Sequence, residues 1–447
     1  MNFDNLKKII ADAAEKMGVS EYEIYYAASS ETSVGGLNKE INSFSSGERG
    51  GVCLRLISDG KMGYASTELM EEGEFSQLVV RALENAKNTD KPSEDGFFEG
   101  SPVYEEKRIK AYEPVSAAKL KSLTLDIMKE IYAVSEKVTD GTEANAASAS
   151  FSVAIANSKG LDLRNECGIN VVVAQAVVSD KGETQADYAF KAYDENTDIK
   201  SLAKETVDGA LSLIGASLVE TGKYDVIIDG KQMRSILSAF SPVFSAKNAQ
   251  MGLSLLKGKE GEMVASEVVT IVDNPQREGS TVGATFDAEG VATKKKFVVE
   301  NGVLKTLLHN RETAKKAGCE TTANASKPSY SSPVGISPYA FSIEAGKYTK
   351  EELYEKVGEG ILITELKGLH AGANAVTGDF SIESAGFMIR GGKLCEAVKS
   401  FTIAGNFFEL LKSISALSDK VEYSVGGSIT SFGSPAVLIP GMSVAGK

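Results

Sequence analysis

The sequence predicts an α+β protein, with mixed helix and antiparallel-sheet domains in its N-terminal half and a strand-rich domain in its C-terminal half. Helical periodicity alternates with strand-like runs, but without the regular strand–helix order of a parallel βαβ fold. Glycine accounts for 43 of the 447 residues and proline for only 10. Because the glycine share exceeds the average of about 7% without any low-complexity tract, it indicates many tight turns between strands.

The first segment, residues 1–90, is the predicted N-terminal α+β domain. Apolar residues from Phe3 to Met17 recur at helical spacing, and a glycine ends that helix. Short alternating stretches follow from Tyr22 to Glu68, with a hairpin signal at Asp59-Gly60. A second amphipathic helix is predicted over Leu78 to Ala86.

A linker is predicted at 91–109, where two prolines and two glycines break the periodicity, and a central α+β domain at 110–220. Ser116 is the predicted N-cap of the first helix of this domain. A second helix is expected around Ile199 to Leu213. Between the helices the sequence predicts three strand-like runs: Phe151 to Ala156, Leu161 to Arg164 and Val171 to Val178.

Residues 221–447 form the predicted C-terminal β-rich domain. It opens with an apolar strand and a helix that begins near Lys231 and meets a proline. The rest is mostly strand and turn, with hairpin signals at Asn301-Gly302 and Gly391-Gly392. One short helix is predicted near Glu351 to Ile361.

Composition excludes several classes of function. No apolar run approaches the roughly 18 residues of a membrane span, and the N-terminus lacks the features of a signal peptide, so we expect a cytoplasmic protein. The four cysteines are scattered without a C-x-x-C pair, which in a reducing compartment is typical of separate packed thiols. The net charge of −13 repels phosphate backbones, so direct nucleic-acid binding is not expected.

A search for catalytic motifs finds little. The two histidines, His309 and His370, are too far apart for a helical H-E-x-x-H pair. We interpret His309 as a half-buried strand histidine bound by a neighbour, and His370, in a glycine-dense loop, as a candidate binding residue. A metal site that combines His370 with Asp379 has no support from spacing, and no serine or cysteine nucleophile signature occurs.

Several blocks of the third segment, taken together and in order, resemble the TldD/PmbA family, once described as modulators of DNA gyrase and implicated in the proteolytic maturation of modified peptides. The order and lengths of the first two segments agree with the same family. The matching blocks are Phe286 to Thr293, Asn301 to Leu304, Leu308 to Ala314, Ala323 to Ala325, Thr377 to Ser381, Phe401 to Asn406 and Gly433 to Ile439.

The resemblance also predicts a missing metal site. TldD-type chains are similar to zinc proteases that carry H-E-x-x-x-H on the first helix of the C-terminal domain and a cysteine ligand near the end of the chain. In this sequence Ser238, Ala239 and Val243 occupy that helix, and the last cysteine is Cys395. The resemblance therefore assigns the chain to the PmbA (TldE) type, a non-catalytic subunit that binds no zinc and is inactive alone.

The same resemblance implies the partners of the chain. They are a TldD-type metalloprotease subunit, which would hold the zinc in a dimer, and an unfolded or modified peptide bound by its backbone to a strand edge. The block with Gly378, Asp379, Phe380 and Ser381, together with His370, is the candidate peptide or partner contact. Two alternatives stay open: a self-sufficient hydrolase with a site around His370 and Asp379, and a binding scaffold or nucleic-acid modulator without a protease partner.

Overall fold

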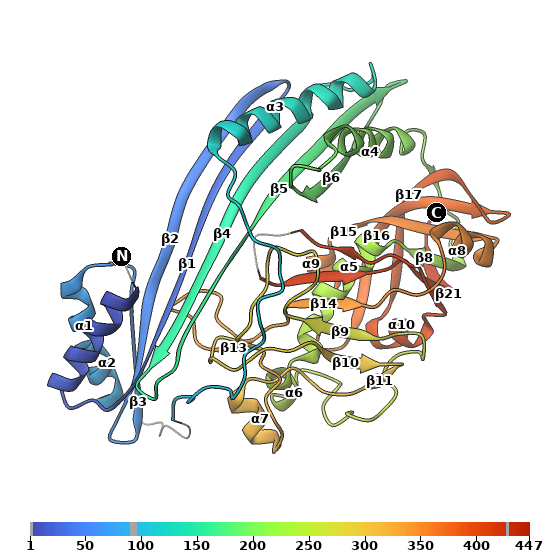
Figure 1. Ribbon diagram of the computed structural model, residues 1–447. Coiled ribbons are helices and arrows are strands. Elements are labelled where there is room, and N and C mark those ends of the chain that lie inside the picture. Colours follow the sequence, from blue (N-terminus) through green and yellow to red (C-terminus); the bar gives the residue numbers. More distant parts are fainter. Residues whose placement is uncertain (1–2, 90–95, 426–428) are drawn as a thin grey trace.

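The computed structural model describes residues 3–89, 96–425 and 429–447, and it is an α+β structure rich in strands, as predicted (Figure 1). Residues 90–95, which include the start of the predicted linker, lie outside the described residues. The N-terminal half is built on one antiparallel sheet with the strand order β3-β2-β1-β4-β5-β6. Its strands are β1 (Glu21–Leu37), β2 (Glu40–Ser58), β3 (Lys61–Thr67), β4 (Glu143–Asn157), β5 (Asp162–Asp180) and β6 (Glu183–Ala192).

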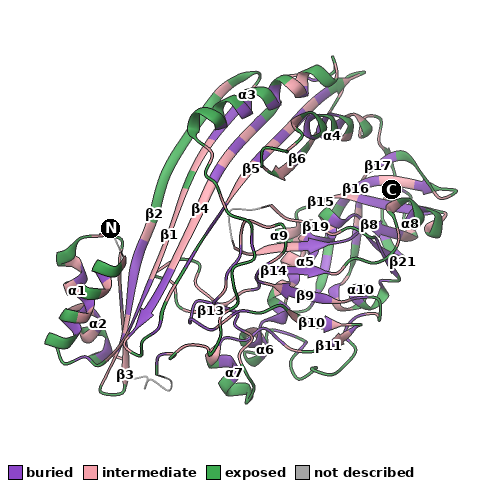
Figure 2. Cartoon of the chain, in the orientation of Figure 1, coloured by how far each residue is buried: buried purple, intermediate pink, exposed green. Residues whose placement is uncertain are grey.

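Strands β1 and β4 join the first two predicted domains into this one sheet. They pair without interruption from Glu23–Asn157 to Leu37–Glu143, so strands from both sides of the linker share a single hydrogen-bond ladder. The sequence predicted short strands over 22–68, and this was wrong, because β1 and β2 run for 17 and 19 residues. Most of the first half of β2 is exposed, so its alternation of apolar and polar residues lapses there while the pairing continues (Figure 2).

Strand β5 is also longer than the sequence predicted. Two of the predicted runs are one strand of 19 residues, and the polar residues between them keep their pairing with β4. The turn signals were correct. Asp59-Gly60 connects β2 to β3, Asn301-Gly302 connects two short strands, and Gly391-Gly392 connects two long ones. All six of these turn residues have positive φ, as a two-residue turn matched to the twist of its strands requires.

Four helices cover one face of the large sheet, two at each end (Figure 1). At one end Ile24 and Leu54 pack beneath α1 and α2, and at the other Val34 and Val172 pack beneath α3 and α4. Because Ile24 and Val34 are an even number of residues apart on β1, both clusters lie on the same face. Ser116 caps α3 by accepting from Lys119 N, as predicted. The helices are α1 (Phe3–Lys16), α2 (Glu72–Lys87), α3 (Ala117–Val134) and α4 (Ile199–Ser212).

The C-terminal half contains a seven-stranded sheet that closes on itself, because β21 pairs with both β8 and β17. A six-stranded sheet, with the order β11-β10-β9-β14-β20-β19, lies beside it, and a two-stranded sheet joins β12 to β13. The strands of the closed sheet are β7 (Ser217–Leu218), β8 (Gly222–Ile228), β15 (Gly360–Lys367), β16 (Asp379–Arg390), β17 (Lys393–Asn406), β18 (Ala416–Leu417) and β21 (Val437–Ala445). The others are β9 (Ile271–Asn274), β10 (Lys296–Glu300), β11 (Val303–Leu304), β12 (Ala325–Ser326), β13 (Gly335–Ile336), β14 (Ala340–Ile343), β19 (Glu422–Tyr423) and β20 (Ser431–Ser434).

The helix α5 (Gly230–Phe240) is largely buried in this half. The sequence predicted a helix from Lys231 onward. Its apolar side chains belong to the largest hydrophobic core, where Phe240 stacks on Phe407 with ring centroids 4.6 Å apart. Pro242 then forces the chain into a 3-10 turn, η1 (Ser241–Phe244). The remaining helices are α6 (Ala246–Gln250), α7 (Arg311–Ala317), α8 (Lys350–Val357), α9 (Leu369–Gly372) and α10 (Phe407–Ser413). None of the described helices is long and apolar enough to cross a membrane.

The uncovered face of the large sheet, here called the inner face, meets the C-terminal half at a junction of apolar and buried charged residues. Tyr25, Cys53 and Ile155 pack against Phe286 and Ala325. Asp287, which follows Phe286 in the sequence, is 2% exposed. Its carboxylate accepts backbone N–H bonds from Glu289, Val291 and Ala325 at 2.9–3.0 Å.

We predict that Asp287 makes the stability of the junction depend on pH. Burial raises the pKa of Asp287 from 3.8 to about 7, so the folded state binds the proton more tightly than the unfolded state. Its contribution to stability is therefore greatest at low pH and is lost as pH rises through 7. Relative to Asp287→Asn, the wild type should gain about 2–3 kcal/mol between pH 8 and pH 5.

Thermal unfolding of both proteins at several pH values measures this difference. The exposed turn variant Asp59→Asn serves as the control, since it should follow the wild type across the range. Parallel pH profiles for wild type and Asp287→Asn would contradict the prediction.

Candidate functional site

A cavity of ≈ 450 Å³ lies where the end of α5 and η1 face β13 and the start of β20, and it is here called the hydroxyl pocket. Serine and threonine side chains contribute much of its wall, and apolar side chains contribute the remainder. The lining residues are Ser238, Ser241, Pro242, Ser245, Lys247, Asn248, Leu308, Ile336, Ser337, Pro338, Thr430 and Phe432.

Backbone hydrogen bonds hold the wall of the hydroxyl pocket in place. Leu308 accepts from Ala246 N at 2.9 Å and donates to Phe244 O at 2.8 Å, which joins η1 and α6 to the segment before α7. On the opposite wall Thr430 Oγ1 donates to Pro338 O at 2.9 Å and lies 3.2 Å from Ser337 Oγ. The pocket is thus built from four separate parts of the chain.

The side chains of the pocket do not fit a zinc site. Of the three residues that stand where the family resemblance places H-E-x-x-x-H, Ser238 lines the pocket, Ala239 packs against the core, and Val243 is fully buried. Zinc takes imidazole, thiolate or carboxylate ligands, usually three from the protein in a catalytic site. None of these groups lines the pocket, and within 3–89, 96–425 and 429–447 no cluster of three or more His, Cys, Asp or Glu side chains could hold a metal ion.

The pocket can instead bind amide groups. Hydroxyls both donate and accept hydrogen bonds, so they match the N–H and C=O groups of a peptide without preference for its side chains. Ile336, Leu308 and Phe432 add apolar surface, and Lys247 contributes the positive charge on the lining. The volume lies in the range of small-ligand sites.

The five residues predicted as peptide or partner contacts lie together, but outside the hydroxyl pocket. Four of them occupy the first residues of β16 and the preceding loop, in which Gly378 N donates to Asn374 O at 2.8 Å, and α9, which carries His370, contacts β16. His370 is exposed in the one-turn helix α9, and Ser381 is exposed on β16. The binding role of these residues stays a prediction.

Three members of this group have structural roles. Phe380 is 4% exposed and meets Phe240 of α5 edge to face, with ring centroids 6.4 Å apart. Asp379 accepts from Asn406 Nδ2 at 2.9 Å, and this bond holds the pKa of Asp379 below its usual value. A side chain at Gly378 would collide with Phe408.

His309 differs from the prediction of a half-buried strand histidine. It is buried, and it lies in the segment before α7 rather than in a strand. Its Nε2 is 3.8 Å from Cys319 Sγ, and burial lowers the pKa of His309. This neutral ring is part of the packing around α7 and does not line the hydroxyl pocket.

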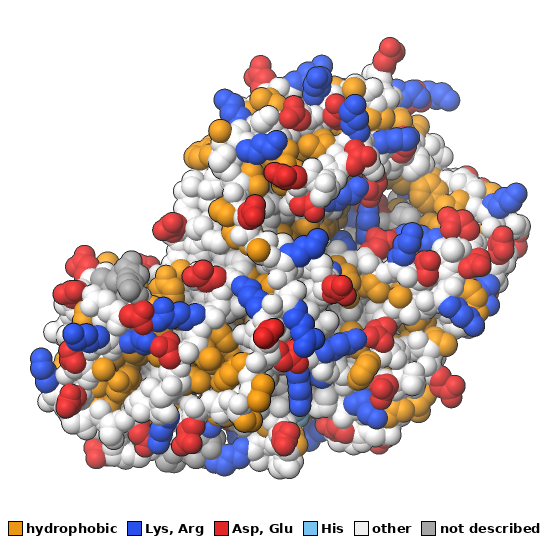
Figure 3. All heavy atoms as spheres, viewed as in Figure 1, with side chains coloured by type: hydrophobic (Ala, Val, Ile, Leu, Met, Phe, Trp, Pro, Cys, Tyr) orange, Lys and Arg blue, Asp and Glu red, His pale blue; other side chains and the backbone are white. Residues whose placement is uncertain are grey.

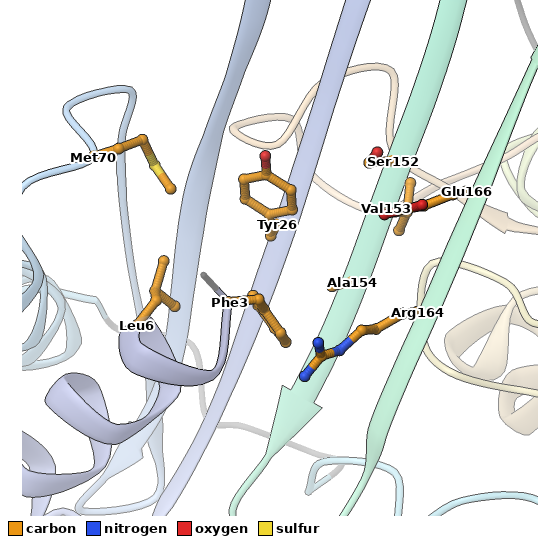
Figure 4. A pocket seen from close by; sticks show the side chains of 9 residues that line it. All are labelled: Phe3, Leu6, Tyr26, Met70, Ser152, Val153, Ala154, Arg164 and Glu166. Atoms are coloured by element: carbon orange, nitrogen blue, oxygen red, sulfur yellow. The ribbon is translucent and has the colours of Figure 1, made fainter. Parts of the chain in front are cut away.

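The family resemblance pointed to the helix that carries Ser238, but the sequence predicted no cavity beside it. Ser238 was located by the family resemblance, whereas Ser337 and Thr430 carried no signal, because single hydroxyls in loops are common. A second cavity, of ≈ 260 Å³, lies between α1 and the helix-covered face of the large sheet (Figure 4). Its one arginine, Arg164, is paired with Asp4 on α1, and its wall holds no recognisable catalytic set.

Three family models match the chain in succession. They are the PmbA/TldA metallopeptidase domain 1 over residues 22–86, the central domain over 110–214 and the C-terminal domain over 221–446. A metalloprotease of Methanocaldococcus jannaschii is 28% identical over 402 residues, which are 87% of each chain.

Two solved structures share the fold. The crystal structure of a protein from Thermotoga maritima, described as a modulator of a DNA gyrase, is 30% identical with a TM-score of 0.89 and covers 99% of this chain and 100% of its own. TldE from Thermococcus kodakarensis is 23% identical, also with a TM-score of 0.89, and covers 98% of this chain and 99% of its own. At that identity the likeness to TldE shows the fold alone.

We predict that Gly378 is required for stability and that His370 is not. Gly378 has φ 85°, and a Cβ there would lie 2.7 Å from the Phe408 ring, so Gly378→Ala should lower stability by at least about 1–2 kcal/mol. His370→Ala removes an exposed side chain and should change stability by less than about 0.5 kcal/mol. Urea denaturation measures both. A midpoint for Gly378→Ala equal to that of the wild type would show that the loop rearranges easily.

Proposed function

This chain belongs to the PmbA/TldD metallopeptidase family, and from that membership we propose that it is the non-catalytic, PmbA/TldE-type subunit of a cytoplasmic metalloprotease complex that acts on peptides. In this complex a TldD-type chain supplies the zinc and the hydrolytic step. The present chain assembles with it and helps to hold an unfolded or modified peptide. The four cysteines are all free, which suits a reducing compartment.

The hydroxyl pocket is the single observation that carries the proposal. It lies at the helix where the family resemblance places H-E-x-x-x-H, yet it offers Ser238 and other hydroxyls instead of metal ligands. A zinc hydrolase activates a water on an open coordination position, so a chain without ligands has no such water. What is left at this position is a cavity suited to the backbone of a peptide.

Exposed apolar residues in the segment that follows the pocket support the assembly with a partner. The chain leaves the pocket after Asn248 and enters a segment in which Met251, Leu255 and Met263 are 63%, 54% and 49% exposed. Leu253 and Val268, 40% and 47% exposed, belong to the same segment, and the five residues together are here called the 251–268 patch. Neighbouring exposed apolar residues are typical of protein–protein contacts, so we assign the patch to the TldD-type partner.

The alternatives have less support. In a self-sufficient hydrolase, Asp379 would have to act as a base or ligand, but its carboxylate is hydrogen-bonded by Asn406 and belongs to the loop packing. A nucleic-acid modulator would need a basic surface, whereas the chain has a net charge of −13. A peptide-binding scaffold without a protease partner would leave the 251–268 patch exposed to water.

We predict that zinc and peptidase activity appear only with a partner. The purified chain should contain less than stoichiometric zinc and should hydrolyse no unstructured peptide, whereas co-expression with a family member that carries H-E-x-x-x-H should yield a complex with both properties. Metal analysis, size-exclusion chromatography and a peptidase assay measure this. Stoichiometric zinc with activity in the chain alone would overturn the proposal.

The 251–268 patch gives a second, sharper prediction. Met251→Glu with Leu255→Glu should weaken the complex at least tenfold, because each removes apolar contact worth roughly 1.5–3 kcal/mol when fully buried. The matched control is Leu394→Glu, which changes a residue of β17 that is 43% exposed. Titration of the labelled chain with its partner measures the affinities. Equal loss in the control, or none in the double variant, would place the interface elsewhere.

A further inference from the structure

Two arginines from separate parts of the C-terminal half converge on Tyr423 of β19. Arg234, on α5, donates from Nη1 to the carbonyl oxygen of Tyr423. Arg277, in the loop after β9, places its guanidinium carbon 4.0 Å from the centroid of the Tyr423 ring. The tyrosine itself is held by pairing with Gly433 on β20 and by its hydroxyl, 3.1 Å from Ser342 Oγ. Arg234, Arg277 and Tyr423 are here called the arginine pair site.

The two guanidiniums form no ion pair with any described residue. In the part of the chain that the structure describes, no carboxylate lies within ion-pair distance of Arg234 or Arg277. Arg234 is only 8% exposed, and Nε of Arg277 is buried with no hydrogen-bond partner among the described residues. Burial lowers the pKa of both side chains. Buried arginines are normally paired, because an unpaired one loses its hydration without compensation.

The two carboxylates that act most on Arg234 also bind a lysine. Asp229 and Glu422 both bind the ammonium group of Lys350, at 2.6 and 2.8 Å. One ammonium balances only one of these two negative charges, and both carboxylates also act on Arg234 through space, although neither lies within ion-pair distance of it. The chain has more acidic residues (61) than basic ones (48), yet both arginines on Tyr423 lack an ion pair with a described residue.

The arginine pair site lies between the C-terminal half and the inner face of the large sheet. The guanidinium of Arg234 lies 5.3 Å from the ring of Phe190 on β6. The loop that carries Arg277 is fixed beneath β5, where Asn165 Nδ2 donates to Gly283 O at 2.9 Å. Figure 3 shows a hollow in the surface beneath α4 and β6 (labelled in Figure 1), on the side of the C-terminal half. Phe432, which lines the hydroxyl pocket, is the residue before Gly433 on the same hairpin.

We propose that Arg234 and Arg277 bind a carboxylate of the peptide whose backbone the hydroxyl pocket receives. A planar guanidinium matches a carboxylate with two parallel N–H donors, and the low-dielectric surroundings strengthen that contact. The carboxylate comes from the C-terminus of the peptide or from an acidic side chain. This inference rests on the proposed function only in taking a peptide as the ligand.

The test uses the isolated full chain and three fluorescent unstructured peptides of one sequence without acidic residues: the free acid, the C-terminal amide, and the amide with one internal glutamate. The wild type should bind a carboxylate-bearing peptide at least tenfold more tightly than the plain amide. Preference for the free acid or for the glutamate peptide identifies the source of the carboxylate. Arg277→Gln should abolish the preference, and Arg277→Lys should restore part of it.

Arg390→Gln is the matched control, since Arg390 is exposed and paired with Glu396 at 2.8 Å. It should keep the preference intact. Arg234→Gln is the second test variant, expected to lose the preference as well. Arg277→Gln breaks no ion pair with a described residue and should unfold within a few degrees of the wild type, whereas Arg234→Gln also loses the bond to the carbonyl oxygen of Tyr423 and should be the less stable of the two.

Equal binding of acid and amide by the wild type, no binding of any peptide, or an unchanged preference in Arg277→Gln would overturn the proposal. A large drop in the unfolding temperature of both glutamine variants, without a change in preference in either, would show a purely structural role. Zinc content and partner assembly decide the proposed function separately, so the two can fail independently.

Discussion

The antiparallel pairing of β1 with β4 is the constraint on which the rest of the structure depends. It joins two stretches of chain, separated by two helices and a long connection, into one ladder, and so makes a single wide sheet instead of two small ones. Because side chains alternate along each strand, a continuous register also fixes which face every apolar residue occupies. The four N-terminal helices therefore all lie on one face. The other face is left for the C-terminal half.

The C-terminal half then packs against the inner face, most tightly at the junction near β1 and β2. At the junction, apolar side chains and fully bonded buried charges meet, as in the pairing of Glu23 with Arg55 Nε at 3.0 Å. Asp273 is similarly enclosed and accepts from Lys296, Asn324 and the backbone of Tyr339. Buried charge is costly unless it is paired, and these contacts meet that requirement. At the arginine pair site the guanidiniums have no such partner among the described residues, and in our proposal a carboxylate of the bound peptide supplies it.

The packing of helix α5 does not depend on a bound metal ion. Helix α5 is held by apolar packing, in which Phe240 contacts both Phe407 and Phe380, and not by ligands. Replacement of ligands by Ser238, Ala239 and Val243 therefore leaves the helix in place, and a cavity with hydroxyl walls lies beside it. Such a cavity fits the backbone of a peptide, and the neighbouring 251–268 patch fits a partner surface. The proposed function follows from these features: assembly and peptide binding by this chain, with zinc chemistry supplied by the partner.

The sequence by itself determined the local features and the family. Helical spacing located the main helices, Ser116 marked a cap, Asn-Gly and Gly-Gly pairs marked hairpins, and the absent H-E-x-x-x-H was visible without coordinates. These features depend on residues close in the chain. Only the tertiary structure decided the strand lengths, because pairing continues through stretches of β2 and β5 whose faces carry no apolar alternation. It also decided the sites. The hydroxyl pocket and the arginine pair site each combine groups more than a hundred residues apart, and single serines or arginines carry no signal of where a distant partner will lie.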